Sequence, residues 1–255
     1  MPQKPDLQLL REYAEEGSEA AFRELVERTT GLVYSAALRQ TGSAEAAQDV
    51  AQSVFTDLAR KARSLAQDPN CHGSLLGWLY RSTRFAALNQ LREEHRRQAR
   101  ERKIMDLSSS DDQAATDWDR VGPVLDEAMS ELNDEDREAL LLRFFKDCDF
   151  RAVGQSLGVT DDAAQKRVSR ALEKLRAAFA RRGVTATAAA LSSALAANAG
   201  TMAPPGLAAT LSSAALAGAG LGAGTAVTAT LTKTIAMTTM QKVVIAATLA
   251  VVAGT

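Results

Sequence analysis

Cysteine and histidine are scarce in this sequence, and their scarcity excludes several classes of protein. The 255 residues include two cysteines and two histidines. Cys71 and Cys148 are far apart and lack the paired spacing of a zinc site, so we expect neither a disulfide framework nor a bound metal. The sequence also has no glycine-rich phosphate loop and no arrangement typical of a catalytic nucleophile. We therefore expect no cofactor, no catalytic residue and no enzymatic activity.

Aromatic residues and prolines are also few, which favours helices over a β-sandwich or barrel. Aromatic residues make up 5% of the chain, and there are 6 prolines. Few segments alternate as strands do, whereas three- and four-residue spacing of apolar residues begins at Ser18. The N-terminal residues MPQKPDLQLLREYAEEG lack the apolar segment of a signal peptide. The sequence thus predicts an all-α protein located in the cytoplasm.

The formal net charge of −1 conceals segments of opposite sign. Residues 92–103 carry six basic and three acidic groups, and residues 163–182 carry seven basic groups and one acid. Residues 106–136 carry eleven acids and one basic residue, Arg120. Because local potential decides what a polyanion meets, the two basic segments are candidates for nucleic-acid binding.

Changes in composition divide the chain into four parts. Residues 1–105 form a first helical domain, and residues 106–122 an acidic, flexible linker. A second helical domain spans residues 123–182, with Pro123 suited to the first turn of a helix. Residues 183–255 are a low-complexity tail rich in Ala, Thr and Gly. We expect two small helical domains joined by the linker and followed by the tail.

The third helix of the first domain is expected from about Leu75 to Lys103. Its first half should bury Trp78, Leu79, Phe85 and Leu88. Trp78 could be a platform on which a base stacks, but its helical spacing with Phe85 favours a place in the core. The second half is almost wholly charged, so it should face solvent or a polyanion.

The second domain contains a predicted helix-turn-helix within residues 150–182. Gly158 is suited to the left-handed turn between the two helices, and Thr160 to the N-cap of the second. Asp161 and Asp162 are stabilised at the positive end of that helix. The small side chain of Gly154 should allow a second helix to cross closely.

The outward face of the second helix carries groups that can read base edges and neutralise phosphates. A basic amphipathic helix is also compatible with an ordinary solvated face, but the preceding short helix and the glycine turn favour DNA binding. The candidate residues for binding duplex DNA, which the resemblance described below assigns to an upstream promoter element, are Thr160, Gln165, Lys166, Arg167, Ser169, Arg170 and Lys174.

Two segments, in this order and spacing, resemble bacterial sigma factors of the sigma-70 family, in the extracytoplasmic-function type. EAAFRELVERTTGLVYSAALRQTGSAEAAQDVAQSVFTDLARK and GSLLGWLYRSTRFAALNQLREEHRR are similar to region two. LDEAMSELNDEDREALLLRFFKDCDFRAVGQSLGVTDDAAQKRVSRALEKLR is similar to region four. The resemblance covers about residues 18–182 and leaves no room for a full region three, as in this compact type.

The resemblance implies two further binding surfaces on the first domain. In the family, the helix that contains DVAQSVFTDL docks on a coiled coil of the polymerase β′ subunit, and its polar face here carries Asp49, Gln52 and Asp57. An ordinary solvated acidic face is the alternative. Residues 70–97 match the part that captures the melted promoter strand, and binding of single strands needs a basic groove with room for an unstacked base. The candidate residues are Asn70, Ser74, Arg81, Arg84, Asn89, Arg92, Arg96 and Arg97.

The implied function is binding of core RNA polymerase through its β′ and β subunits, followed by promoter recognition, DNA melting and transcription initiation. The resemblance also makes an anti-sigma factor a candidate partner. An ordinary helix-turn-helix regulator that does not join the polymerase is the alternative. It would bind a duplex site through residues 123–182 alone and would have no affinity for the core enzyme.

The tail raises the question of membrane attachment. Residues 243–255 are an apolar run of about 20 Å of helix, short of the roughly 30 Å of a bilayer core, and extension back to Thr234 includes Lys242. Residues 184–203 and 207–232 are long enough to span a bilayer but only weakly apolar. Tethering to the inner membrane and a self-packing or poorly ordered tail both remain open.

Overall fold

The computed structural model describes residues 4–67, 75–102, 117–184, 187–198 and 203–220, and these residues contain helices and no strand. This confirms the predicted all-α fold. The elements are α1 (Asp6–Glu16), α2 (Glu19–Thr41), α3 (Ala44–Gln67), α4 (Leu75–Arg102), α5 (Asp117–Glu131), α6 (Asp134–Leu140), the π-helical turn η2 (Leu141–Phe145), α7 (Phe150–Leu157), α8 (Asp161–Arg181), α9 (Ala188–Asn198) and α10 (Leu207–Gly220).

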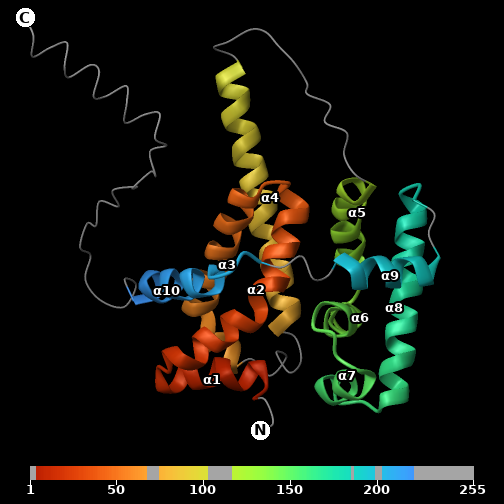
Figure 1. The fold of residues 1–255 in the computed structure, drawn as a ribbon, viewed down its shortest axis with the longest axis horizontal. Coiled ribbons are helices and arrows are strands. Elements are labelled where there is room, and N and C mark those ends of the chain that lie inside the picture. The colour runs from red at the N-terminus through yellow and green to blue at the C-terminus, as the bar shows by residue number, and fades with distance from the viewer. Residues whose placement is uncertain (1–3, 68–74, 103–116, 185–186, 199–202, 221–255) are drawn as a thin grey trace, which may run out of the picture. The chain divides into compact units, whose positions relative to one another are not determined.

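A first hydrophobic core is formed by α1, α2, α3 and α4, with α10 packed against it (Figure 1). Phe22 of α2, Phe55 of α3 and Leu79 of α4 are completely buried at its centre. Leu9 and Leu10 of α1 are buried in the same core. Helix α1 was not predicted, although its apolar residues follow helical spacing and Gly17 ends it in a left-handed conformation.

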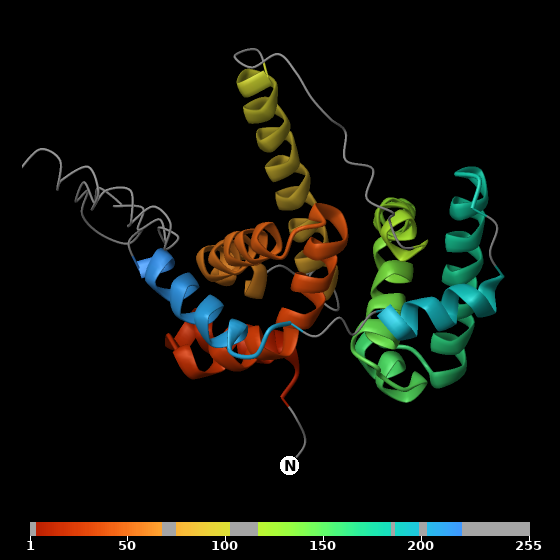
Figure 2. The ribbon, with the colours of Figure 1, turned by 45° about the horizontal axis from the view of Figure 1, so that its top comes forward.

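A second core is formed by α5, α6, η2, α7, α8 and α9 (Figure 2). Met129, Leu140, Leu175 and Phe179 are completely buried in it. Side chains of α2 and α4 also belong to this second core, among them the buried Tyr80. The two domains that the sequence predicts are therefore in contact through α2 and α4.

Local signals in the sequence place the helix ends correctly. The Ser18 hydroxyl accepts a hydrogen bond from the Ala21 N–H at 3.3 Å and caps α2. The Asn133 side chain does the same for the Asp136 N–H at 2.9 Å and caps α6. Helix α4 runs from Leu75 to Arg102, close to the predicted range.

The prediction that α4 buries Phe85 is wrong, because Phe85 is 67% exposed and is the large apolar side chain that stands out from the described surface. The buried stripe of α4 instead follows Leu76, Tyr80, Thr83 and Ala87. At 100° per residue, Phe85 lies almost opposite this stripe. Trp78 is half-buried and packs against the first core, which agrees with the structural role expected for it.

The helix that contains Pro123 begins earlier than the sequence suggests. Helix α5 starts at Asp117, inside the predicted linker, so Pro123 lies within the helix and not in its first turn. A proline removes its own backbone N–H, and the segments on both sides can remain helical at the cost of that hydrogen bond. The earlier part of the linker, residues 103–116, lies outside the described residues.

The tail forms two short helices where it is described. Helices α9 and α10 contain 11 and 14 residues, fewer than the roughly 20 that cross a bilayer. Within the described parts of the chain, no helix combines the length and the apolar character needed to cross a membrane. The apolar run at residues 234–255 lies outside the described residues.

Candidate nucleic-acid and polymerase interfaces

Helices α7 and α8 form the predicted helix-turn-helix, and its turn depends on two glycines. Gly158 ends α7 with φ 67°, the left-handed conformation expected for it. A Cβ at Gly154 would lie 2.8 Å from the Val159 carbonyl oxygen, so only glycine fits there. The atoms that approach Gly154 belong to the backbone of the turn. The sequence had instead led us to predict that a second helix crosses there.

The polar face of α8 is held outward by the buried stripe of Ala164, Val168, Ala171 and Leu175. Most of the predicted upstream DNA-binding residues are exposed, namely Thr160, Gln165, Lys166, Ser169, Arg170 and Lys174. The Thr160 hydroxyl caps α8 by accepting from the Ala163 N–H at 3.3 Å.

Two of the basic residues on α8 form ion pairs with α6. Arg167 is half-buried and pairs with Glu135 at 2.7 Å, and Lys174 pairs with Asp136. Both pairs connect α8 to α6. Lys166 and Arg170 extend from the same helix toward solvent, with an Arg170 Nε–H···O=C bond to Lys166 at 3.3 Å. Lys166 and Arg170 are therefore the best placed of these cations to meet a phosphate or a base edge.

The predicted residues for the melted strand lie along α4 where they are described. Arg81, Arg92, Arg96 and Arg97 are exposed, while Arg84 and Asn89 are half-buried. Arg81 forms an ion pair with Asp134, which belongs to α6. Asn70 and Ser74, the predicted pocket wall, lie outside the described residues.

Phe85 is a feature of this face that sequence reasoning missed. It shares a stripe of α4 with Arg81 and Arg92, four residues before it and seven after it. An exposed aromatic ring beside guanidinium groups is the combination that binds single-stranded nucleic acid, because the ring stacks on a base while the cations meet phosphates. The sequence signal that could have revealed this is the position of Phe85, which lies on the opposite side of α4 from the buried residues Leu76, Tyr80 and Ala87.

The predicted polymerase-binding residues lie on the outer face of α3. Asp49 and Gln52 are exposed, and Asp57 is half-buried and forms an ion pair with Lys61 at 3.3 Å. The opposite face of α3 is fixed in the first core by Val50, Val54 and Leu58. The structure therefore places these three polar side chains on one helix, with Asp49 and Gln52 open to a partner.

A buried ion pair joins the two cores. Arg39 of α2 pairs with Asp126 of α5 at 3.1 Å, and their side chains are 5% and 2% exposed. The Tyr80 hydroxyl also donates to Asp126. Burial is the largest influence and acts to lower the pKa of Arg39, but the interactions with Asp126 and Tyr80 together outweigh it and raise that pKa, so the guanidinium stays charged. Its Nη1 has no hydrogen-bond partner, and its Nε and Nη2 both donate to Asp126. The buried guanidinium therefore relies on Asp126 for its hydrogen bonds.

Glu138 of α6 caps the start of α4. Its carboxylate accepts a hydrogen bond from the Gly77 N–H at 3.0 Å, one of the donors that the first turn of a helix leaves without an internal partner. Glu138 is 4% exposed. Burial raises the pKa of its carboxyl from 4.5 to about 8, although the Gly77 bond acts to lower it.

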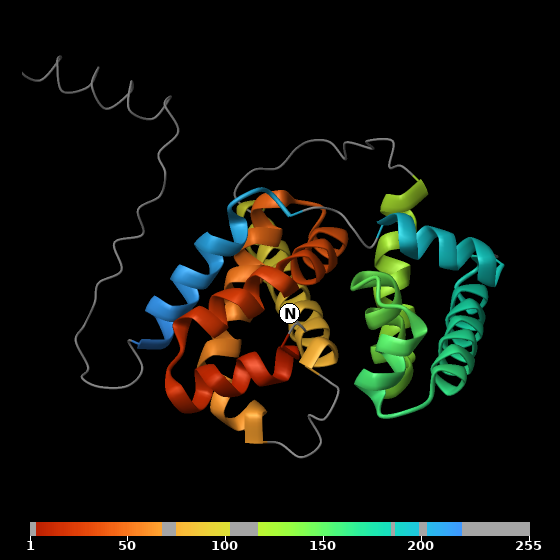
Figure 3. The same ribbon diagram turned by 60° about the horizontal axis from the view of Figure 1, so that its bottom comes forward.

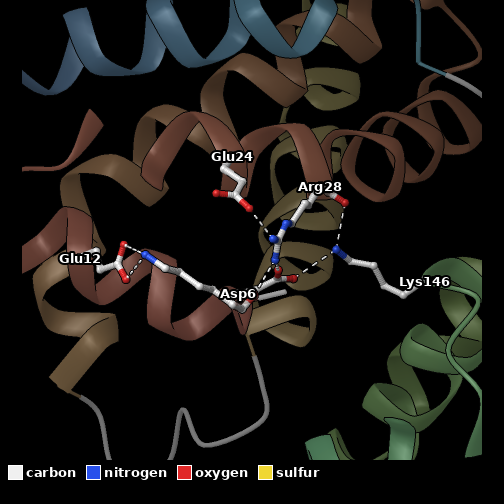
Figure 4. Close-up of polar contacts among 6 residues, drawn as sticks. Asp6, Glu12, Glu24, Arg28 and Lys146 are labelled. Carbon is white, nitrogen blue, oxygen red and sulfur yellow. Dashed lines mark hydrogen bonds and ion pairs between the residues drawn. The ribbon is translucent and has the colours of Figure 1, made fainter. Parts of the chain in front are cut away.

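A further polar contact between the domains lies around α1 (Figure 4). Lys146 pairs with Asp6 at 3.1 Å and donates to the Arg28 carbonyl at 2.9 Å. Arg28 in turn pairs with Asp6 at 3.3 Å and with Glu24. Together with the Arg39–Asp126 and Glu138–Gly77 contacts, this network holds the second core against α1, α2 and α4.

We expect the protein to lose stability as the pH rises, because Glu138 then ionises at a buried position. Because the folded-state pKa is raised, the folded protein binds more protons at Glu138 than the unfolded chain between pH 4.5 and 8. The free energy of unfolding should therefore fall by roughly 4–5 kcal/mol between pH 4.5 and pH 9, and roughly 3 kcal/mol of this fall lies between pH 6 and pH 9. Urea unfolding at pH 6 and pH 9 measures it.

Glu138→Gln is the control for this prediction, because its amide oxygen can accept the Gly77 hydrogen bond without titrating. Arg81, Asp134 and Arg137 also influence this carboxyl, and they remain in the variant. An equal loss of stability between pH 6 and pH 9 in both proteins would contradict the assignment to Glu138.

The two groups of helices match known families. Residues 25–97, from α2 to α4, match the family model described as Sigma-70 region 2. Residues 124–175, from α5 to α8, match the one described as Sigma-70, region 4. The chain is also similar to a probable RNA polymerase sigma factor, RfaY, of Xanthomonas campestris pv. campestris, with 29% identity over 170 residues. That match covers 64% of this chain and 42% of the relative, so the chain spans less than half of the relative's length.

Proposed function

Because the chain belongs to the sigma-70 family, in its compact extracytoplasmic-function type, we propose that it binds core RNA polymerase and directs promoter recognition, DNA melting and transcription initiation. Region two comprises residues 1–105 and region four residues 123–182 in this proposal. The observation that carries it is the presence of two basic helical faces, on α4 and α8, in domains with separate cores. Such an arrangement can contact one promoter at two places.

Region four reads the upstream duplex element with α8. Lys166 and Arg170 contact the DNA from the exposed face, while Gln165 and Ser169 can exchange hydrogen bonds with base edges. Arg167 and Lys174 reach the DNA only by leaving their ion pairs with Glu135 and Asp136. We therefore assign them a smaller share of the binding than their charge suggests.

Region two holds the downstream element after it opens. Arg92, Arg96 and Arg97 neutralise the phosphates of the single strand, and Phe85 stacks on an unpaired base. Base stacking and phosphate contacts to the captured strand offset the free energy of melting. Arg81 joins this surface when its ion pair with Asp134 opens.

We expect Phe85→Ala to weaken binding of single-stranded promoter DNA by roughly 1–3 kcal/mol, because a stacking platform is lost. Phe85 is exposed, so the fold should remain stable. Fluorescence anisotropy with a labelled non-template strand and the holoenzyme measures the effect. Phe85→Tyr keeps the ring and should bind like the parent protein, and an equally weak Tyr variant would show that the ring does not stack.

Association with the polymerase separates this function from that of an ordinary helix-turn-helix regulator. The purified chain should bind core RNA polymerase and start transcription at specific promoters selected from a library. Asp49→Lys should weaken this binding about tenfold, since it reverses a charge at the proposed β′ contact. Glu27→Lys, which reverses an exposed acid on α2 and not on α3, is the control.

A chain that fails to join the polymerase, or that binds DNA without changing initiation, would support the regulator instead. Partnership with the polymerase also implies work in the cytoplasm, where the polymerase acts. An anti-sigma factor, if one exists, would have to cover Asp49 and Gln52 or the exposed face of α8 to block these contacts.

A further inference from the structure

Helix α10 packs on the helix that carries the proposed polymerase contact. It lies beside α2 and α3 in the three views (Figures 1, 2 and 3). Leu207, Leu211 and Ala215 of α10 are buried in the first core, together with Ser212. A segment that follows region four in sequence is thus docked on region two.

The end of α10 meets α3 next to the polymerase contact. Arg60 donates a hydrogen bond to the Gly218 carbonyl at 3.1 Å, and a Cβ at Gly218 would lie 3.1 Å from the Thr56 methyl group. Thr56 and Arg60 follow Gln52 at intervals of four residues, so the three lie on one stripe of α3. A helix of another protein that binds along this stripe would meet α10 at its C-terminal half.

Helix α9, which precedes α10, is attached to the other domain. Leu191 and Leu195 are buried in the second core, and α9 contacts α8 and η2. Between the two helices lie residues 199–206, which can span at most about 28 Å when fully extended. We call α9 and α10 together the strap, because these two helices are docked on different cores.

We propose that the docked strap weakens the binding of polymerase, and that α10 leaves α3 when polymerase binds. The inference rests on the proposed function, in which region two and region four contact separate promoter elements. Two features oppose polymerase binding while α10 is docked, although Asp49 and Gln52 themselves stay exposed. The end of α10 shares a stripe of α3 with the polymerase contact, and the short connection to α9 restrains the separation of the two cores.

The occupant of the α2–α3 surface is therefore a segment of the same chain. Residues 184–232 contain no charged residue, so α10 makes no ion pair. Among the described residues, the Arg60 side chain of α3 donates a hydrogen bond to α10. The docking depends on burial of Leu207, Leu211 and Ala215 without ion pairs, which suits a contact that has to be reversible.

A disulfide tests the proposal in the full chain. Thr56→Cys and Gly218→Cys, with Cys71 and Cys148 changed to Ser, would place two thiols at a distance suited to a disulfide, because Gly218 faces the Thr56 side chain. Oxidised glutathione should form the bond readily in the isolated protein. The oxidised form should bind core RNA polymerase at least tenfold more weakly than the same protein after reduction with dithiothreitol.

The control is Thr56→Cys without the Gly218 change, treated with the same oxidant and reductant. Equal affinity of the oxidised and reduced double variant for polymerase would overturn the proposal and make α10 a permanent part of region two. Failure to form the disulfide would also count against it, because α10 would not be docked as described. If the reduced protein does not bind polymerase, the proposed function fails, and the inference falls with it.

Discussion

Replacement of Lys166 and Arg170 by alanine is expected to abolish selection of the upstream promoter element, lowering promoter affinity by roughly 100-fold. Both residues are exposed on α8 and lack the α6 ion pairs that engage Arg167 and Lys174. Loss of a base contact costs about 1–3 kcal/mol, and loss of each phosphate contact lowers the salt dependence of binding. Holoenzyme binding to a selected promoter, measured at several salt concentrations, gives both quantities.

Arg176→Ala provides a matched control for this double variant. Arg176 is an exposed arginine on the same helix, paired with Glu173 at 2.8 Å, and it is not among the proposed DNA contacts. It removes one positive charge from α8 without changing the proposed reading face. If the double variant and the control lose the same affinity per charge, α8 acts only through its net charge and not as a recognition helix.

Replacement of Asp126 by alanine is expected to have the largest effect on stability, about 3–5 kcal/mol. Arg39 would then be a buried cation without its carboxylate, and the Tyr80 hydroxyl would lose its acceptor. The loss should be concentrated where the two cores meet, between α2, α4 and α5. Urea unfolding gives the free energy, and hydrogen exchange shows whether α5 opens before the first core.

The double replacement Arg39→Met with Asp126→Leu tests the explanation. Removal of both charges of a buried ion pair is often neutral, because neither partner is left without its counter-charge. The double variant should therefore be clearly more stable than Asp126→Ala alone. A double variant that is as unstable as the single one would show that packing volume matters at this site and charge does not.

Features that depend on local chemistry could be predicted from the sequence. Gly158 needed a left-handed conformation, and Asn133 and Thr160 needed to cap the helices that follow them. The outward face of α8 followed from the spacing of its buried residues. Each of these signals acts within a few residues, so no knowledge of the rest of the chain was required.

Features that depend on distant contacts could not be predicted. Position 85 of α4 has helical spacing with Trp78, but only the packing of α2, α3 and α6 determines which side of α4 is buried. Arg39 and Asp126 are 87 residues apart, and nothing near either residue indicates its partner. The docking of α10 could not be predicted for a related reason. Its apolar residues are distributed around the helix, so the sequence does not indicate which face is buried.

The charge-free composition of the strap has a consequence for how temperature acts on the protein. The attachment of α10 depends mainly on burial of Leu207 and Leu211, and the free energy of such burial weakens on cooling. The partly exposed Lys146–Asp6 pair is weakened by salt, whereas the buried Arg39–Asp126 pair is screened much less. Cold and high ionic strength would thus loosen different contacts: cooling weakens the docking of α10, and salt weakens the Lys146–Asp6 pair.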